Sequence, residues 1–270
     1  MNKDNNIEEV LKLISSKGMT FSSFMKEVVV SDIDRFKNLT EWSQKDFEEY
    51  SVLLDKAENI SSKGDSEAKT KEVGDVLEDL VTFIIERTYF FEVIRNIRTR
   101  TNEIDLYISR SVVGAQALKR YDISEDLLVI PDKIFLGECK NYDKNIGSTW
   151  FGKFYAVMKT CDCDFGILFS LKRATGNFDN WSDSYGLIRT LTLIEKYEHG
   201  KDFVLIDFGL SDFKAINKET SFFDIIKRKI IALKTGTNYD NLVKKLQKDL
   251  DKEKQAIANE FKELKESRKD

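Results

Sequence analysis

The feature that most limits the fold of this sequence is the alternation of apolar runs and amphipathic stretches between residues 73 and 210. Apolar residues at helical spacing predict three helices in this region, at Val73–Thr88, Thr149–Thr160 and Ser182–Glu198. Short apolar runs predict five strands, at Phe90–Ile97, Glu103–Ser109, Lys133–Lys140, Phe165–Leu171 and Phe203–Phe208. This order of elements is typical of an α/β domain with a mixed central sheet flanked by helices.

The regions on either side of this domain are predicted to be helical. Residues 1–60 form an N-terminal helical region, and residues 59–72, which have Ile60 as their only large apolar side chain, indicate a linker or surface loop. Residues 221–270 form a C-terminal helical segment, whose last part has the spacing of an amphipathic helix at Val243, Leu246, Leu250, Ile257, Phe261 and Leu264. This helix either lies on the body of the protein or forms a coiled coil that makes a homodimer.

Composition excludes several classes of protein. Nineteen Phe, nine Tyr and three Trp supply a hydrophobic core, which excludes a disordered chain. No apolar run approaches the ~20 residues that span a bilayer, and the polar N-terminus is unlike a signal peptide, so we expect a cytoplasmic protein. A single histidine, His199, excludes sites built on several histidines. Any catalysis must therefore use carboxylates, lysine and a hard cation.

The third predicted strand ends in two opposite charges. Side chains alternate across a sheet, so Glu138 and Lys140 share one face with Ile134 and Leu136. Burial of either charge without a partner would be costly. Antiparallel pairing with the preceding strand would bring Asp105 towards this charged end. We therefore expect these three side chains to meet.

A shared divalent cation is one explanation of this cluster. Asp105 and Glu138 would supply carboxylate oxygens and Cys139 its backbone carbonyl, which suits Mg²⁺, with Mn²⁺ as a substitute. Lys140 would orient or deprotonate a water and stabilise negative charge on a phosphate, giving metal-assisted hydrolysis of a phosphodiester. The structural alternatives are a salt bridge at the strand end, and pairing of Asp105 with Arg98 or Arg100.

Three segments resemble the PD-(D/E)xK nuclease superfamily, and most closely its Mrr-like restriction endonucleases. They are Gly74-Asp-Val-Leu-Glu78 on a predicted helix, Asn102-Glu-Ile-Asp105 on a strand and Gly137-Glu-Cys-Lys140 on the next strand. Each motif is weak by itself, but their order on matching elements is more specific. The resemblance covers about residues 73–210.

The resemblance implies a restriction-endonuclease-like core and a Mg²⁺-dependent endonuclease that hydrolyses DNA, in a restriction or phage-defence setting. It makes Asp105 and Glu138 metal ligands, Lys140 the catalytic lysine and Glu78 a supporting acid. The literal Pro131-Asp132 pair departs from this pattern. On an extended strand Asp132 would lie ~20 Å from Glu138, so we assign the motif's aspartate to Asp105 instead.

A local excess of basic residues supports a nucleic-acid partner. Residues 133–173 contain seven basic and four acidic residues, in a chain with a net charge of −4. We expect Lys144, Lys153, Lys172 and Arg173 to contact the phosphate backbone, although any single lysine is nearly as well explained as part of a solvated face. The alternative functions are a non-catalytic nucleic-acid-binding or assembly subunit on the same fold, within a larger defence complex, and a structural interaction protein. Residues 110–132 are an insertion that contacts substrate, contacts a second copy or forms a surface loop.

Overall fold

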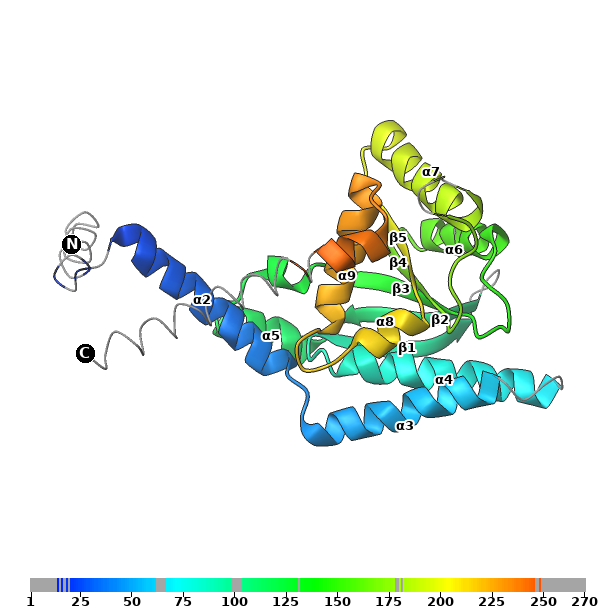
Figure 1. Cartoon of the computed structure of the whole chain (residues 1–270), viewed down its shortest axis with the longest axis horizontal. Coiled ribbons are helices and arrows are strands. Elements are labelled where there is room, and N and C mark those ends of the chain that lie inside the picture. Colours follow the sequence, from blue (N-terminus) through cyan, green and yellow to red (C-terminus); the bar gives the residue numbers. More distant parts are fainter. Residues whose placement is uncertain are drawn as a thin grey trace.

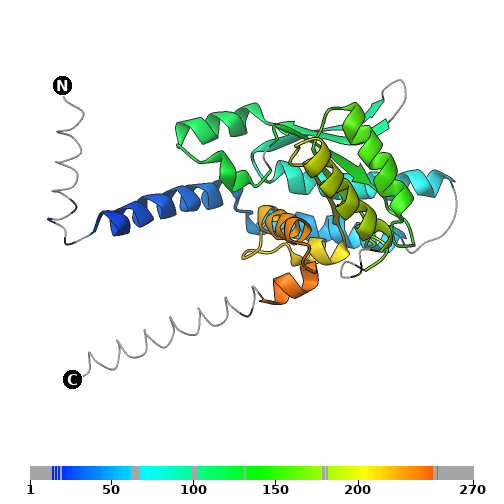
Figure 2. The same ribbon diagram turned by 90° about the horizontal axis from the view of Figure 1, so that it is seen from above.

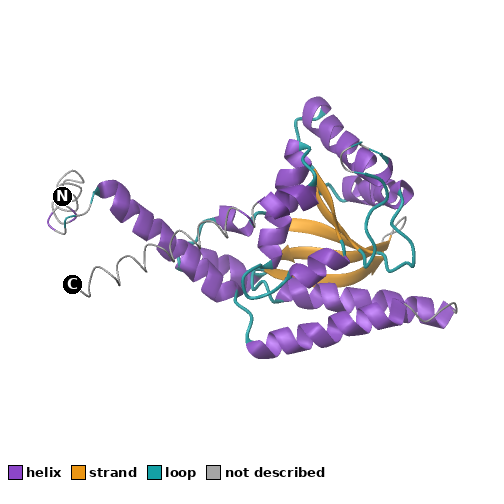
Figure 3. Cartoon of the chain, in the orientation of Figure 1, coloured by secondary structure: helices purple, strands orange, loops and turns teal. Residues whose placement is uncertain are grey.

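The computed structural model describes residues 14, 16, 18, 20–61, 67–98, 103–130, 132–177, 180, 182–245 and 248. Its centre is a five-stranded sheet in the order β1-β2-β3-β4-β5 (Figures 1 and 3). The strands are β1 (Phe91–Arg98), β2 (Glu103–Arg110), β3 (Ile134–Cys139), β4 (Phe165–Phe169) and β5 (Val204–Phe208). All five predicted strands are confirmed to within two residues, because each apolar run is bounded by polar residues.

The sheet is mixed. β1, β2 and β3 pair antiparallel, whereas β3, β4 and β5 pair parallel. Parallel neighbours need crossover connections, and these are the two predicted helices α6 (Ser148–Thr160) and α7 (Asp183–Glu198). The fold is therefore the predicted α/β architecture, a mixed sheet flanked by helices, and is consistent with a restriction-endonuclease-like core. The carboxyl ends of β3, β4 and β5 lie at one edge of the sheet.

Helices cover both faces of the sheet. On one face α6 packs closely on β4, because a Cβ at Gly166 would lie only 2.4 Å from the Met158 sulfur. On the other face lie three helices, α4 (Glu67–Glu86), α8 (Leu210–Ala215) and α9 (Phe222–Thr235). Aromatic contacts fix α8 and α9 there: Phe213 lies 4.8 Å from Phe208, and Phe223 lies 6.3 Å from Phe91, between ring centroids.

The N-terminal helices share this core. α3 (Gln44–Ser61) lies against α4, and the Tyr50 hydroxyl donates to the Phe213 carbonyl at 2.7 Å. In α2 (Phe21–Thr40), Phe36 near the carboxyl end lies 5.4 Å from the Phe90 ring and 5.4 Å from the Phe223 ring. The other end of α2 projects away from the body (Figure 2). The division of the chain into three segments stays a prediction, but one core joins helices from all three.

Two connecting segments differ from expectation. The predicted linker at residues 59–72 is wrong at both ends, because α3 runs to Ser61 and α4 begins at Glu67. Good helix formers such as Ala, Lys and Glu continue a helix without any large apolar side chain. The insertion at 110–132 contains α5 (Val112–Arg120) and the short 3₁₀ helix η1 (Glu125–Leu128), begun by the N-caps Ser111 and Ser124.

The predicted C-terminal amphipathic helix lies mostly outside the described residues. Residues 239–245 are helical, but five of the six apolar positions that predict an amphipathic helix fall on residues that the structure does not describe. The predicted homodimer through this helix therefore stays a prediction. Within the described residues no helix has the length and apolar character needed to cross a membrane.

Candidate active site

The two central antiparallel strands bring the predicted site residues together. Leu106 of β2 pairs with Gly137 of β3, so the next step of the same register places Asp105 opposite Glu138. Residues directly opposite one another in an antiparallel pair project from the same face. Strand pairing continues past Cys139, because the Lys140 N–H donates to the Phe169 carbonyl at 2.9 Å. This keeps Lys140 in line with Glu138.

One ammonium group joins the two carboxylates. Lys140 Nζ lies 2.6 Å from Glu138 Oε1 and 3.2 Å from Asp105 Oδ2, and all three side chains are at most 16% exposed. The Cys139 N–H also donates to Asp105 Oδ2, at 2.8 Å. The expected meeting of Asp105, Glu138 and Lys140 is therefore confirmed. Arg98 is bound to Glu103 instead, so it is not the partner of Asp105; Arg100 lies outside the described residues.

Burial sets the electrostatics of this cluster. Burial, together with the charge of Asp105 and against the attraction of Lys140, raises the pKa of Glu138 to about 7. Burial alone would lower the pKa of Lys140, but the two carboxylates raise it above its usual value, so the side chain carries a full positive charge. Two carboxylates around one ammonium leave a net negative charge when both acids are ionised. Such a cluster attracts a further cation.

Glu78 is held next to this cluster by other partners. It lies on α4, and its Oε2 accepts hydrogen bonds from Arg95 Nη2 at 2.9 Å and from Asn96 Nδ2 at 3.1 Å. Burial raises the pKa of Glu78, and the nearby negative charge of Asp105 contributes to this increase. Glu78 is therefore neither a solvated helix charge nor, in this arrangement, a partner of Lys140.

Two aromatic residues beside Lys140 were not identified from the sequence. The Trp150 ring on α6 lies 5.1 Å from Lys140 Nζ and 4.8 Å from Lys153 Nζ, so one indole contacts two cations. Tyr142, which is 38% exposed, lies 5.4 Å from the Trp150 ring. The clustering of Tyr142 and Trp150 around the loop after the motif strand is the signal that would have indicated them.

The loop after β3 also holds an unfilled acceptor. Asn141 donates from Nδ2 to the Val73 carbonyl at 3.2 Å, which ties the end of β3 to α4. Its Oδ1 is buried and has no hydrogen-bond partner in the described part of the chain. A buried acceptor of this kind needs a donor such as a bound water.

The donor set fits a hydrated divalent cation. No group of three or more His, Cys, Asp or Glu side chains that could hold a metal ion occurs among the described residues. The predicted ligands, however, are two carboxylates and a carbonyl, and Mg²⁺ commonly takes one or two carboxylates and keeps several waters. Because the Cys139 N–H points to Asp105, the Cys139 carbonyl also faces the Asp105 side of the strand.

The predicted basic residues occupy the same edge of the sheet. Lys144 lies in the β3–α6 loop, Lys153 on α6, and Lys172 and Arg173 follow β4. An isolated bridge between Ile146 and Ala174 joins the two loops. Lys144, Lys153 and Lys172 are exposed, whereas Arg173 is bound to Asp240.

Asp132 lies elsewhere, before β3 begins. The pKa of its carboxyl is raised by burial and by the charges of Asp164 and Asp202. Asp164 directly precedes β4, and Asp202 lies just before β5, so these acids mark the amino ends of the parallel strands. The structure therefore separates Asp132 from Glu138, as the strand length requires.

No family model matches this chain, and neither a curated protein nor a solved structure matches it. The resemblance to the PD-(D/E)xK nuclease superfamily therefore stays a prediction.

Proposed function

We propose that this protein is a metal-dependent endonuclease that hydrolyses phosphodiester bonds in DNA. The observation that carries the proposal is the convergence of the Asp105 and Glu138 carboxylates on the Lys140 ammonium, at the carboxyl edge of a mixed sheet. Two acids around one lysine also occur at Lys229, which lies between Asp207 and Asp212, so the number of acids alone does not indicate catalysis. The two largely buried acids around Lys140 also follow the chain order of the resembled nucleases, and this order supports a catalytic site more strongly than a scaffold.

Each residue of the cluster has a role that its contacts support. Asp105, Glu138 and the Cys139 carbonyl would hold Mg²⁺ or Mn²⁺. The bound metal would polarise a phosphoryl oxygen and lower the pKa of a water. Lys140, whose raised pKa keeps it protonated, would stabilise negative charge on the phosphate rather than remove a proton. Glu78 would act at a distance, by holding Arg95 and adding negative charge near Asp105.

The surroundings of the cluster support a nucleic-acid substrate. Lys144, Lys153 and Lys172 expose positive charge around it, as a phosphate backbone requires. The exposed Tyr142 ring offers a surface on which a base can stack. The resemblance favours DNA, and a restriction or phage-defence role in the cytoplasm. A homodimer through the C-terminal helix, or a larger defence complex, would supply the second site needed to cut both strands.

Cleavage assays test this function. Supercoiled plasmid, single-stranded DNA and single-stranded RNA are each incubated with Mg²⁺, with Mn²⁺ and with EDTA. The proteins compared are the wild type, Lys140→Ala, and the matched control Lys234→Ala, which removes an exposed lysine that also pairs with an aspartate. We expect metal-dependent DNA cleavage that Lys140→Ala loses and Lys234→Ala keeps.

Two other results have distinct meanings. Equal cleavage by Lys140→Ala and the wild type would contradict the proposed site. DNA binding without cleavage on any substrate by the wild type would favour the non-catalytic nucleic-acid-binding subunit. A metal-binding measurement separates the cases further: Mg²⁺ should raise the melting temperature of the wild type and of Lys234→Ala, but not that of Asp105→Asn.

A further inference from the structure

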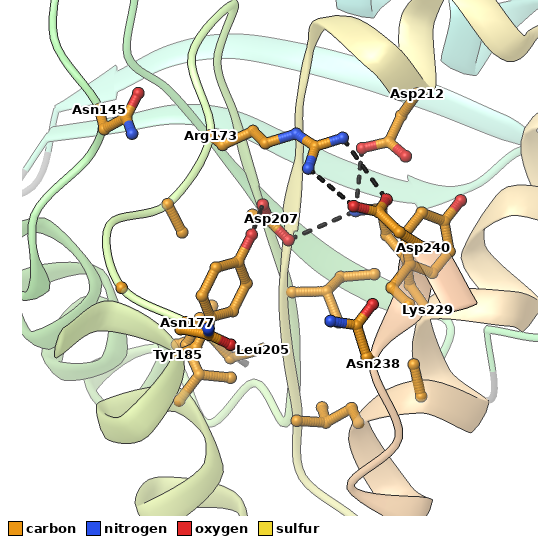
Figure 4. Close-up of a pocket in the computed structure, with 17 residues that line it drawn as sticks. Asn145, Arg173, Asn177, Tyr185, Leu205, Asp207, Asp212, Lys229, Asn238 and Asp240 are labelled. Atoms are coloured by element: carbon orange, nitrogen blue, oxygen red, sulfur yellow. Dashed lines mark hydrogen bonds and ion pairs between the residues drawn. The ribbon is translucent and has the colours of Figure 1, made fainter. Parts of the chain in front are cut away.

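A pocket opens near the carboxyl ends of β4 and β5 (Figure 4). It has a volume of about 350 Å³ and is lined by residues of α7, β5, α9 and the loop after β4. This size lies within the range of small-molecule sites, which is roughly 300–1,000 Å³. The crevice beyond the carboxyl ends of parallel strands is also where α/β sheets usually bind ligands. The proposed active site does not use this pocket.

The charged side chains at the floor of the pocket form ion pairs with one another. Lys229 Nζ lies 2.9 Å from Asp212 Oδ2 and 3.3 Å from Asp207 Oδ1, and the Tyr239 ring covers it at 4.4 Å. The Tyr185 hydroxyl donates to the other oxygen of Asp207 at 3.2 Å. One ammonium between two carboxylates has no charge left for an anion. The floor therefore fixes the shape of the pocket and does not itself attract a phosphate.

The rim of the pocket carries a guanidinium whose partner can leave. Arg173 Nη1 donates to Asp240 Oδ2 at 3.0 Å, and Nη2 donates to the Ser211 hydroxyl at 3.2 Å. In Figure 4 the Arg173 side chain reaches across the pocket to the Asp240 carboxylate. Both side chains are about half exposed, at 53% and 48%. An ion pair that is this exposed contributes little, so another anion can replace the carboxylate.

Asp240 belongs to a segment that follows a turn. α9 ends at Thr235, and its C-cap Gly236, whose positive φ of 68° reverses the chain, is followed by Asn238, which begins the helical residues 239–245. The Asn241 N–H donates to Asn238 Oδ1 at 3.2 Å, as at a helix start. Tyr239 anchors this segment over Lys229, and Asp240 follows it directly. Asp240 can therefore leave Arg173 without any change in the sheet.

We propose that Arg173 and Ser211 form a binding position for a phosphate group of a nucleic-acid strand, which Asp240 occupies until the strand displaces it. This proposal rests on the proposed nuclease function, because it extends the substrate track from the active site. The Ile146 N–H, in the loop that follows Lys140, donates to the Arg173 carbonyl at 2.9 Å, so the two positions are joined along one edge. Exposed Lys172 adjoins Arg173.

The chemistry favours a phosphate over the aspartate. Arg binds phosphate oxygens through two parallel N–H donors, and a strand that binds several cations also releases counterions. The Asp240 carboxylate is a single negative charge and competes for the same donors. Removal of that charge should therefore strengthen DNA binding, whereas removal of other surface acids should not.

The test is a DNA-binding titration with the full-length protein in EDTA, at several salt concentrations. Asp240→Asn should bind a short DNA about threefold to tenfold more tightly than the wild type, with a salt slope steeper by about one counterion. The matched control is Asp202→Asn, which removes an exposed aspartate paired with Lys234 near the amino end of β5 and should leave affinity unchanged. The double variant Arg173→Ala/Asp240→Asn should lose the whole gain in DNA affinity.

A second arm separates this proposal from the proposed function. Inorganic pyrophosphate is titrated into the same variants and its heat of binding is measured. If no variant binds DNA but Asp240→Asn binds pyrophosphate and the double variant does not, the position takes a free phosphate compound and the nuclease proposal fails. If Asp240→Asn and Asp202→Asn behave alike towards both DNA and pyrophosphate, the phosphate position at Arg173 is refuted.

Discussion

The buried lysine of α9 gives the sharpest test of the fold's energetics. Lys229 is 8% exposed and lies between Asp207 and Asp212, whose side chains are 14% and 4% exposed. Replacement by methionine keeps the length and shape of the side chain but leaves two buried carboxylates without a cation. Removal of one partner from a buried ion pair costs about 3–5 kcal/mol. For a chain of this size, that corresponds to a decrease in melting temperature of about 6–20 °C.

The same helix supplies the matched control. Lys234 also pairs with an aspartate, Asp202, at 2.7 Å, but the two side chains are 44% and 71% exposed. Exposed pairs contribute about 0–1 kcal/mol, so Lys234→Met should change the free energy of unfolding by less than about 1 kcal/mol. Urea denaturation followed by circular dichroism measures both variants. Equal, small effects of the two substitutions would refute the argument from burial.

The loss in the free energy of unfolding of Lys229→Met should also depend on pH. Burial already raises the pKa of Asp212, and without the lysine the folded-state pKa of this carboxyl should lie further above its unfolded value. A group with a raised folded pKa stabilises the protein below its unfolded pKa, and this contribution is lost as the pH increases. The deficit relative to wild type should therefore grow between pH 5 and pH 8. A deficit that shrinks over this range would contradict the explanation.

Three further predictions concern the site and its supports. Glu78→Gln should reduce the free energy of unfolding by about 1–3 kcal/mol, because Arg95 loses a buried charged acceptor. DNA cleavage by this variant should decrease less than in Lys140→Ala. Complete loss of cleavage in the folded protein would instead make Glu78 catalytic. Tyr142→Ala should weaken single-stranded DNA binding by about 1–3 kcal/mol in an anisotropy titration, whereas Tyr142→Phe should not. Gly166→Ala should destabilise by about 1–3 kcal/mol in urea, since its Cβ would meet the Met158 sulfur. An equally large further loss when Gly166→Ala is added to Met158→Ala would contradict this cause.

The sequence predicts the sheet well because strand signals are local. Each strand is an apolar run bounded by polar residues, and the alternation of β3, which continues to Lys140, places Glu138 and Lys140 on one face. The contact of Lys140 with Asp105 then follows from antiparallel pairing of consecutive strands. The chemistry that the cluster performs stays a prediction, because geometry fixes where charges lie and not which reaction they catalyse.

Other features depend on contacts that no local pattern contains. The partners of Glu78 come from β1, where Asn96 has a positive φ of 55°, and neither the partner nor the backbone conformation is visible in the helix motif. The buried Lys229 did leave a signal. It interrupts the apolar stripe of α9 between Ile226 and Leu233, where a charge is out of place unless it has a partner.

The shared core has a consequence for the order in which the protein is made. Tyr50 on α3 bonds Phe213, 163 residues further along the chain, and Phe36 on α2 packs on Phe223. During synthesis on the ribosome, the aromatic side chains of α2 and α3 therefore cannot be covered until α8 and α9 have been made. The hairpin of β1 and β2, which carries Asp105, forms from neighbouring segments. The sheet that contains this hairpin is not fully covered by helices until α9 has been made. We therefore expect nascent chains that end before α9 to bear the site residues without a stable site.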